Sequence, residues 1–281
     1  KQPKADSTCT LYCGLTSLCN FDLVRQEYPQ ENYLANQTAY LEQWAKQQSE
    51  IYKDYPQNLD QLYQNKVKKH LKRYIRLGVP DSLKKDLVTS LLQLKQLDLS
   101  YKSALLDVFS NKVPSCFSVV PTFTEQTDPL QVLPKHYLNH EGVLAWKRVL
   151  WVVSQFHSFI KYCPQIVSVV SLLLLYLEED QTYLVVSRLL SFSKKHNEFI
   201  RWHFTLDKKH NLKIAQATAD IIQRNSKSLT KALANANLVS LVENMLDSFL
   251  VGYFPLSFLE RLVFCFISEG IKVVVRATYT L

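Results

Sequence analysis

Glycine is scarce in this chain, with 5 residues among 281, and the turn dipeptides Asn-Gly and Asp-Gly are absent. These dipeptides are the strongest short-range signal of a β-hairpin, so the sequence offers little support for an antiparallel sheet. Apolar residues make up 47% of the chain, enough to bury a sizeable core, and leucine-rich stretches recur at helical spacing. The sequence therefore predicts an all-α protein.

Long apolar runs are also absent. The longest run without a charge, Ile166–Leu177, has 12 residues, whereas a helix needs roughly 20 to cross a bilayer. Because Pro164 precedes this run, we interpret it as a buried helix of the core. Asn139 is the expected N-cap of the helix that ends before Pro164. The polar start of the sequence, Lys1–Lys4, lacks the apolar region of a signal peptide. We therefore expect a cytoplasmic protein.

The sequence has little that would hold a metal or a nucleotide, and it contains no glycine-rich phosphate loop. Three of its six cysteines lie close together without a nearby histidine: Cys9, Cys13 and Cys19. Three histidines recur every seven residues, but no cysteine or carboxylate set completes a site: His196, His203 and His210. We expect reduced cysteines, no metal and no cofactor.

The most informative segment is Tyr253–Leu281, which predicts two helices joined at a glycine. Ser257 and Glu260 have the spacing of a capping box at a helix start. Four apolar residues then share one helical face: Leu259, Leu262, Val263 and Phe266. Gly270 is expected to end this helix, and the next helix opens at Lys272.

This segment resembles the last helices of the TBC domain, the helical domain of Rab-family GTPase-activating proteins. The family pattern is roughly P-x-x-x-h-x-R-h-W-D-x-F-h-x-E-G-x-K-h-h-h-R, where h is an apolar residue. The family's Trp-Asp pair is replaced here by Val263-Phe264. The matching positions in this chain are Arg261, Glu269, Gly270, Lys272 and Arg276.

Three further segments resemble family motifs, in the family's order. The segment RLGVPDSLKKDL, which starts at Arg76, is similar to the opening of the domain. Thr122-Phe123 lies where the family has D-x-x-R-T-F, and Tyr162-Cys163 where it has Y-C-Q-G. The resemblance implies an all-α TBC domain with two helical subdomains over residues 66–281. Residues 1–65 would form an N-terminal helical extension, either packed on the domain or a mobile arm.

In active TBC domains an arginine and a glutamine, the two finger residues, reach into the active site of the GTPase. Such an arginine is worth several orders of magnitude in rate. Here Pro121 stands at the arginine position and Pro164 at the glutamine position. Gln165 comes one residue late and would point about 100° away on a helix. The resemblance therefore implies a GTPase regulator that lacks both the arginine and the glutamine finger residue. The alternative is an active Rab GTPase-activating protein that uses atypical residues, such as Gln165 or Lys112.

Within the family, these segments are most similar to the TBC–TLDc branch, whose members carry a C-terminal TLDc domain. No such domain is present in this sequence, so we expect the chain to be the TBC portion of a longer protein. The resemblance implies a regulator of vesicle trafficking that lies peripherally on a vesicle or plasma membrane. Its implied partners are a small GTPase of the Rab or Arf class and phosphoinositide lipids.

The formal net charge is +8, and basic residues come from both ends of the expected domain. The resemblance implies a cationic pocket for phosphoinositide headgroups, lined by Lys84, Lys85, Arg261, Lys272 and Arg276. A further basic cluster precedes the opening motif: Lys66, Lys68, Lys69, Lys72, Arg73 and Arg76. The alternative is that individual basic residues line solvated helix faces or pair with carboxylates. Because no nucleic-acid-binding motif is present, we do not expect nucleic acid as a partner.

Overall fold

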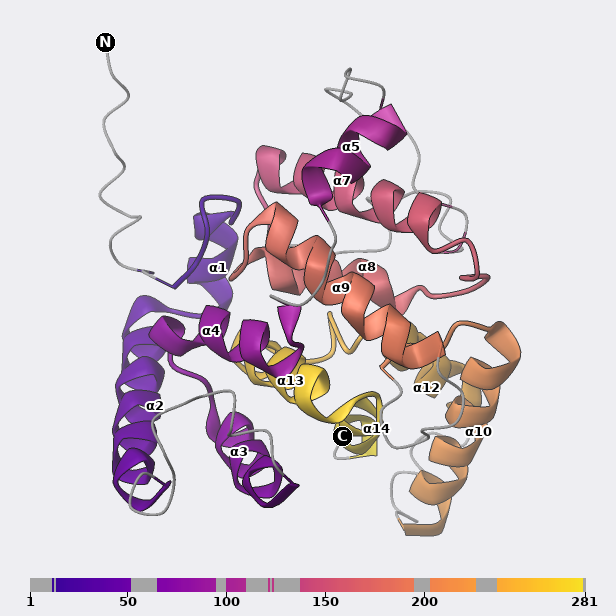
Figure 1. Ribbon diagram of the computed structural model, residues 1–281. Helices are drawn as coiled ribbons and strands as arrows, with labels where there is room; N and C mark the ends of the chain where they lie inside the picture. The colour runs from indigo at the N-terminus through magenta and orange to yellow at the C-terminus, as the bar shows by residue number, and fades with distance from the viewer. Residues whose placement is uncertain are drawn as a thin grey trace.

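The computed structural model describes residues 12, 14–51, 65–94, 100–109, 121, 123, 137–194, 203–225 and 237–279. Within these ranges the regular elements are all helices, apart from two isolated β-bridges, so the all-α prediction is confirmed (Figure 1). The helices are α1 (Phe21–Glu27), α2 (Gln30–Ile51), α3 (Asn65–Leu77), α4 (Asp81–Leu91), α5 (Tyr101–Phe109), α7 (His140–Phe156), α8 (Gln165–Leu174), α9 (Glu179–Lys194), α10 (Lys208–Asn225), α12 (Leu238–Asp247), α13 (Leu256–Glu269) and α14 (Lys272–Tyr279).

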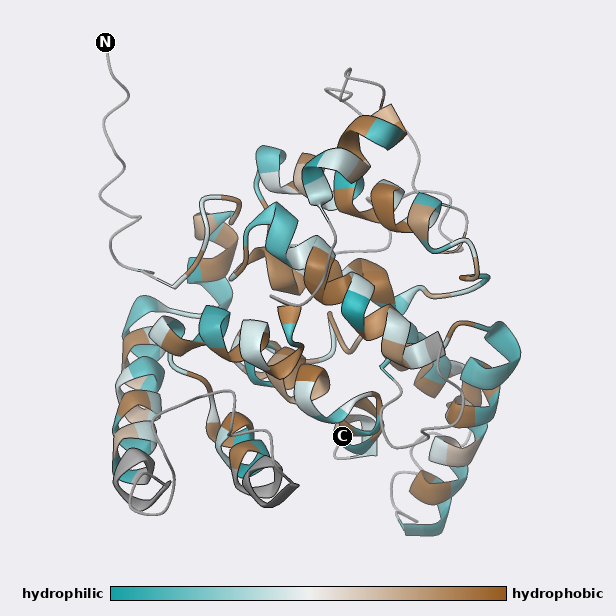
Figure 2. Ribbon diagram, viewed as in Figure 1, coloured by the Kyte–Doolittle hydropathy of each residue, from teal (hydrophilic) through white to brown (hydrophobic). Residues whose placement is uncertain are grey.

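Two apolar helices organise the core. Every residue of α8 is buried, which confirms the interpretation of that uncharged run as a core helix. Helix α13 packs against α3, α4, α8 and α14 and so joins the two ends of the described chain. Figure 2 shows brown, hydrophobic positions concentrated on the helices in the middle of the molecule and more teal on the outer helices such as α10. None of the described helices is both long and apolar enough to span a membrane.

The local helix signals are confirmed at two positions and wrong at a third. Asn139 caps α7, because its Oδ1 accepts a hydrogen bond from the Gly142 N–H at 2.9 Å. Gly270 ends α13 with a φ of 80°, a conformation that favours glycine. The capping box expected at Glu260 does not form, since the residue that caps α13 is Pro255, which makes no side-chain hydrogen bond. Glu260 instead points into the core.

The N-terminal extension is packed on the domain over the residues that the structure describes. Thr16 donates its N–H to the Leu175 carbonyl at 2.8 Å and its hydroxyl to the Leu174 carbonyl at 2.6 Å, at the end of α8. The Asn139 N–H in turn donates to the Leu18 carbonyl at 2.9 Å. Buried side chains from this segment belong to the same hydrophobic cluster as α8 and α13. The extension and the domain therefore share one core.

Candidate functional site

The two finger positions lie next to each other. The Cys163 N–H donates a hydrogen bond to the Phe123 carbonyl at 2.8 Å, so the two motif segments meet although about 40 residues separate them in sequence. Pro121 and Pro164, which the family resemblance places at the finger positions, are both buried. Neither proline has a donor group that could stabilise charge or orient water. The structure thus brings together the two segments that the family resemblance assigns to the fingers.

Gln165, the candidate replacement for the glutamine finger, is held inside the protein. It begins α8 and is 2% exposed, and its Nε2 donates to Asn211 Oδ1 at 3.3 Å. Asn211 donates to Asp247 at 2.8 Å, and the Tyr162 hydroxyl donates to the same carboxylate at 2.7 Å. This buried network satisfies the polar groups that the site removes from water. To reach a partner, Gln165 would have to break it. Lys112, the other candidate, lies outside the described residues.

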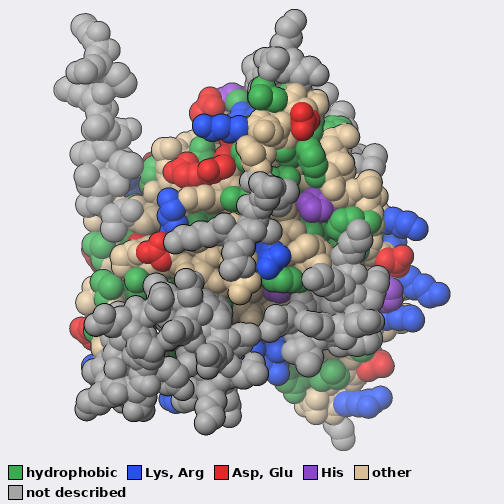
Figure 3. Space-filling view, in the orientation of Figure 1, with side chains coloured by type: hydrophobic (Ala, Val, Ile, Leu, Met, Phe, Trp, Pro, Cys, Tyr) green, Lys and Arg blue, Asp and Glu red, His purple; other side chains and the backbone are tan. Residues whose placement is uncertain are grey.

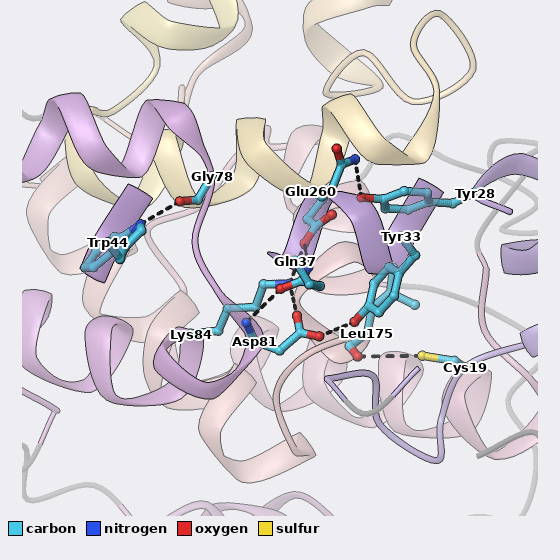
Figure 4. A network of polar contacts seen from close by, with 11 residues as sticks. Cys19, Tyr28, Tyr33, Gln37, Trp44, Gly78, Asp81, Lys84, Leu175 and Glu260 are labelled. Atoms are coloured by element: carbon cyan, nitrogen blue, oxygen red, sulfur yellow. Dashed lines mark hydrogen bonds and ion pairs between the residues drawn. The ribbon is translucent and has the colours of Figure 1, made fainter. Parts of the chain in front are cut away.

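Lys84, assigned to the headgroup pocket from the sequence, is instead buried in the core. Its side chain is 2% exposed, and its Nζ donates to Asp81 at 2.6 Å and to Glu260 (Figure 4). The same nitrogen lies 4.0 Å from the centroid of the Tyr176 ring. A buried ammonium group is stable only when it is paired and hydrogen-bonded, and two carboxylates meet that need here. The expectation that Lys84 lines an accessible pocket is therefore corrected.

The buried Lys84 network also ties the N-terminal extension to the domain. Gln37 of α2 donates to Glu260 at 3.3 Å and accepts a hydrogen bond from the Asp81 N–H at 3.0 Å. Figure 4 shows these side chains pointing toward one another, with the Tyr33 hydroxyl bonded to Asp81. Burial and the negative charge of Glu260 raise the pKa of the nearby Tyr40 to about 12. The network joins α2, α4 and α13 and has a structural role.

A second ion pair, at the other end of α13, is open to solvent on its basic side. Glu269 is buried and accepts two hydrogen bonds from Arg76 of α3, from Nε at 2.6 Å and from Nη2 at 2.6 Å. The Arg76 side chain is 52% exposed. Burial alone would raise the pKa of Glu269, but the Arg76 hydrogen bonds and the charges of Arg76, Lys272 and Lys72 outweigh it, so that the pKa is lowered. The charges of three cations thus act on one buried carboxylate.

Arg261 belongs to the same region. Burial and Glu269 raise the pKa of the Cys265 thiol to about 12, while the charges of Arg76 and Arg261 act in the opposite direction. The charges of both arginines therefore act on the same buried thiol, in the C-terminal half of α13. We define the α13 basic surface as the four cations Lys72, Arg76, Arg261 and Lys272.

The other predicted pocket residues, Lys85 and Arg276, are exposed. Arg276 lies one turn after Lys272 on α14, and Lys85 lies on α4, which also packs on α13. The sequence prediction missed Lys72 and Arg76 as site residues, although it noted their basic cluster. The signal was available, because basic residues four apart recur on both α3 and α14, at 72 and 76 and at 272 and 276.

Arg148 forms a second two-bonded pair, with Glu179, through Nε at 2.7 Å and Nη2 at 2.6 Å. Figure 3 shows Lys and Arg side chains gathered at the right edge of the molecule, over α10. The exposed lysines of that helix are Lys208, Lys209 and Lys213. His203 is buried, with Nε2 3.1 Å from the Ile267 carbonyl, and His196 lies outside the described residues. No group of three or more possible metal ligands occurs among the described residues.

Comparison with known structures identifies the fold. The chain is similar to the crystal structure of the TBC domain of Skywalker/TBC1D24 from Drosophila melanogaster, with a TM-score of 0.66, 20% identity, and coverage of 79% of this chain and 72% of that one. A second structure of the same domain, in complex with inositol(1,4,5)triphosphate, matches with a TM-score of 0.64 and 21% identity over 79% of this chain and 76% of that one. At these identities the likeness shows the fold.

Sequence comparisons agree with the fold. The chain is 23% identical over 185 residues to TBC1 domain family member 24 of Xenopus tropicalis, which covers 66% of this chain and 32% of that protein. The chain thus spans about a third of the length of this relative. The model of the Rab-GTPase-TBC domain family matches residues 124–281, more than half of the 281 residues. The chain belongs to the Rab-GTPase-TBC domain family.

Proposed function

We propose that this TBC domain binds phosphoinositide headgroups at the α13 basic surface and regulates a small GTPase in vesicle trafficking without accelerating GTP hydrolysis. The observation that carries the first half is the convergence of Lys72, Arg76 and Lys272 on Glu269, at a surface where the guanidinium remains half exposed. The complex of the Drosophila TBC domain with inositol(1,4,5)triphosphate supports the same class of ligand here. Binding a lipid headgroup would place the protein on the surface of a membrane.

The chemistry of the α13 basic surface suits a headgroup with several phosphates. Arginine offers a planar fork that pairs with two phosphate oxygens, and lysine acts as a point charge that tolerates several geometries. The four cations of this surface outnumber the one carboxylate, Glu269, that pairs with them. They come from α3, α13 and α14, and both α3 and α14 pack on α13. We add Arg276 and Lys85 as supporting residues, because both are exposed on helices that pack on α13.

Calorimetric titration with soluble inositol(1,4,5)trisphosphate tests the site. Because a hydrogen bond to a charged group contributes about 1.5–3 kcal/mol, we expect Lys272→Glu to weaken binding about tenfold or more. Lys213→Glu, the same charge reversal on exposed α10, is the matched control and should change affinity less than about twofold. Equal effects of the two variants would show nonspecific attraction and reject the site. Binding should also weaken steeply with added salt.

A sedimentation assay with vesicles distinguishes a lipid ligand from a free phosphate compound. Vesicles of phosphatidylcholine with a few per cent of phosphatidylinositol bisphosphate should bind the protein, and phosphatidylcholine alone should not. Reversing one charge near an anionic leaflet removes one attraction and adds one repulsion, each of about 1 kcal/mol. Lys272→Glu should therefore reduce vesicle binding about thirtyfold. Tight binding of the soluble headgroup with no vesicle binding would argue for a soluble inositol phosphate as the ligand.

The second half of the proposal rests on the finger positions. A single arginine finger raises the rate of GTP hydrolysis by a factor of about 10³–10⁵. Pro121 and Pro164 contribute no such group. We expect negligible acceleration in single-turnover GTP hydrolysis with a panel of Rab and Arf GTPases. Acceleration of more than about a hundredfold would contradict the loss of the fingers. The GTPase could then still be a partner, but the domain would act as its activator.

An activator with atypical residues is the alternative function. Gln165 is the described candidate, and its buried hydrogen bond to Asn211 argues against such a role. If any hydrolysis is accelerated, Gln165→Ala should leave the rate unchanged while lowering the free energy of unfolding by about 1–3 kcal/mol, the cost of an unsatisfied buried partner. Loss of hydrolysis in a variant that remains folded would favour the alternative.

A further inference from the structure

The Arg76–Glu269 pair has the geometry of a phosphate contact. The pair uses Nε and Nη2 of Arg76, which form one edge of the guanidinium, and both bonds measure 2.6 Å. This two-bonded arrangement is the one by which arginine binds phosphate groups. Inside the α13 basic surface, one edge of the arginine is therefore already bonded to an anion that belongs to the protein.

The carboxylate is built into the fold at this point. Glu269 is the last residue of α13, and its side chain is 2% exposed, whereas the Arg76 side chain is 52% exposed. Gly270 then turns the chain so that Lys272 opens α14 three residues later. The charges of Lys272 and Lys72 both favour the ionised form of Glu269. Glu269 is thus a fixed negative charge among the cations that would bind a ligand.

A fixed negative charge changes how strongly the surface attracts an anion. It neutralises one of the neighbouring cations and repels the ligand directly, and both effects grow with the charge of the ligand. Because Glu269 is buried, solvent screens its charge less than that of an exposed carboxylate. Its position behind Arg76 also keeps the guanidinium in one orientation with its other edge toward solvent.

We propose that Glu269 is an internal counter-ion that limits the affinity of the α13 basic surface for phosphorylated headgroups. This inference rests on the proposed headgroup site and adds a residue that regulates it. The carboxylate and a ligand phosphate share the Arg76 guanidinium, so each ligand must bind a surface that is already partly neutralised. The consequence is a weaker and more readily reversible association with the membrane than the four cations would give alone.

Replacing the carboxylate by an amide tests the proposal. Glu269→Gln keeps the size of the side chain and an oxygen that can accept one bond from Arg76, but it removes the charge. Titrations of the full chain with inositol(1,4,5)trisphosphate should show an affinity about fivefold higher or more than in the wild type. Asp220→Asn, which changes the net charge equally at an exposed position of α10, is the matched control and should leave the affinity unchanged.

Inorganic phosphate provides a readout that a structural role would not produce. If Glu269 acts as an electrostatic counter-ion, Glu269→Gln should raise the affinity for the trisphosphate more than the affinity for inorganic phosphate, because the repulsion scales with the charge of the ligand. Equal gains for both ligands would indicate a loosened structure and overturn the proposal. An unchanged or weaker affinity for the trisphosphate in a folded Glu269→Gln protein would also overturn it, whereas a wild type that binds no trisphosphate would reject the headgroup site itself.

A second variant keeps the test decisive if Glu269→Gln does not fold. Glu269→Asp keeps the charge but shortens the side chain, so that the carboxylate no longer bonds both Arg76 nitrogens in the same geometry. Because the charge that opposes the ligand remains, the affinity for the trisphosphate should stay within about twofold of the wild type. A gain in affinity of about fivefold or more in this variant would show that bond geometry and not charge limits binding, and it would overturn the role of Glu269 as a counter-ion.

Discussion

Helix α13 carries two buried glutamates that form ion pairs of very different kinds. Glu260 and Glu269 lie nine residues apart, so they project from opposite sides of the helix. Each pairs with a basic residue of the same sequence motif, Glu260 with Lys84 and Glu269 with Arg76. The lysine is 2% exposed and the arginine 52%. Similar residues thus form a structural network on one side of α13 and a candidate ligand site on the other.

The difference follows from what covers each pair. On the Glu260 side, α2 and α4 close over the ion pair and supply Gln37 and Asp81 as further partners. On the Glu269 side, α3 ends at Leu77 and leaves its last-turn arginine facing solvent. A buried pair must satisfy all its groups internally, whereas a half-exposed arginine retains hydrogen-bonding capacity for a ligand. Exposure of the cation, and not the presence of an ion pair, separates the two roles.

Removing the buried cation should have the largest effect. Lys84→Met leaves Glu260 and Asp81 without their shared partner in the core, and we expect a loss of about 3–5 kcal/mol in the free energy of unfolding. Chemical denaturation followed by circular dichroism measures this loss. Lys85→Met, the exposed neighbour on α4, is the control and should stay within about 0.5 kcal/mol of the wild type. Similar losses in both variants would refute the structural role of Lys84.

Removing the link to α2 should have an intermediate effect. Gln37→Ala deletes the side chain that bonds both Glu260 and the Asp81 N–H, and we expect a loss of about 1–3 kcal/mol. Thr38→Ala, at the exposed neighbouring position of α2, should cost much less. Denaturation curves of the two variants compare them directly. A loss no greater than that of the control would mean that α2 does not depend on this network.

Removing the exposed cation should have the smallest effect on stability and the clearest dependence on pH. The pKa of Glu269 in the folded state lies below its usual value of 4.5. The ion pair with Arg76 therefore stabilises the folded state at pH values above 4.5. This stabilisation is lost as the pH falls through the folded-state pKa of Glu269. Arg76→Met should therefore lower stability at pH 7 by less than Lys84→Met does. The difference in the free energy of unfolding between Arg76→Met and the wild type should become smaller in acid. Denaturation curves at pH 7 and pH 3 measure this difference. A difference that does not change with pH would contradict the pairing of Arg76 with an ionised Glu269.

Local features of the fold could be predicted because they depend on nearby residues. Asn139 caps α7, Gly270 ends α13, and the uncharged run that forms α8 is buried, as its pattern indicated. The capping box at Ser257 and Glu260 was wrong for a physical reason. Helix α13 begins at Leu256, two residues earlier than the capping box requires, so Glu260 is its fifth residue and pairs with Lys84 instead of bonding back to the helix start.

The basic site could be predicted only in part. The sequence contains the cations, and the family resemblance pointed to Arg261, Lys272 and Arg276. It also assigned Lys84, which the tertiary structure buries, and it left out Lys72 and Arg76, which the structure brings to Glu269. The four-residue spacing of Lys72 and Arg76 marks a basic helix face, but it does not reveal that Arg76 pairs with Glu269, which lies 193 residues away.

The sequence alone is enough to predict that the chain is helical and where several of its helices begin and end. These properties depend on backbone preferences and on hydrophobic periodicity, which act over a few residues. The tertiary structure decided which cations are buried and which face solvent, because that depends on the helices that pack over each side of α13. The same charge has a structural role where neighbouring helices exclude water and is available to a ligand where they do not.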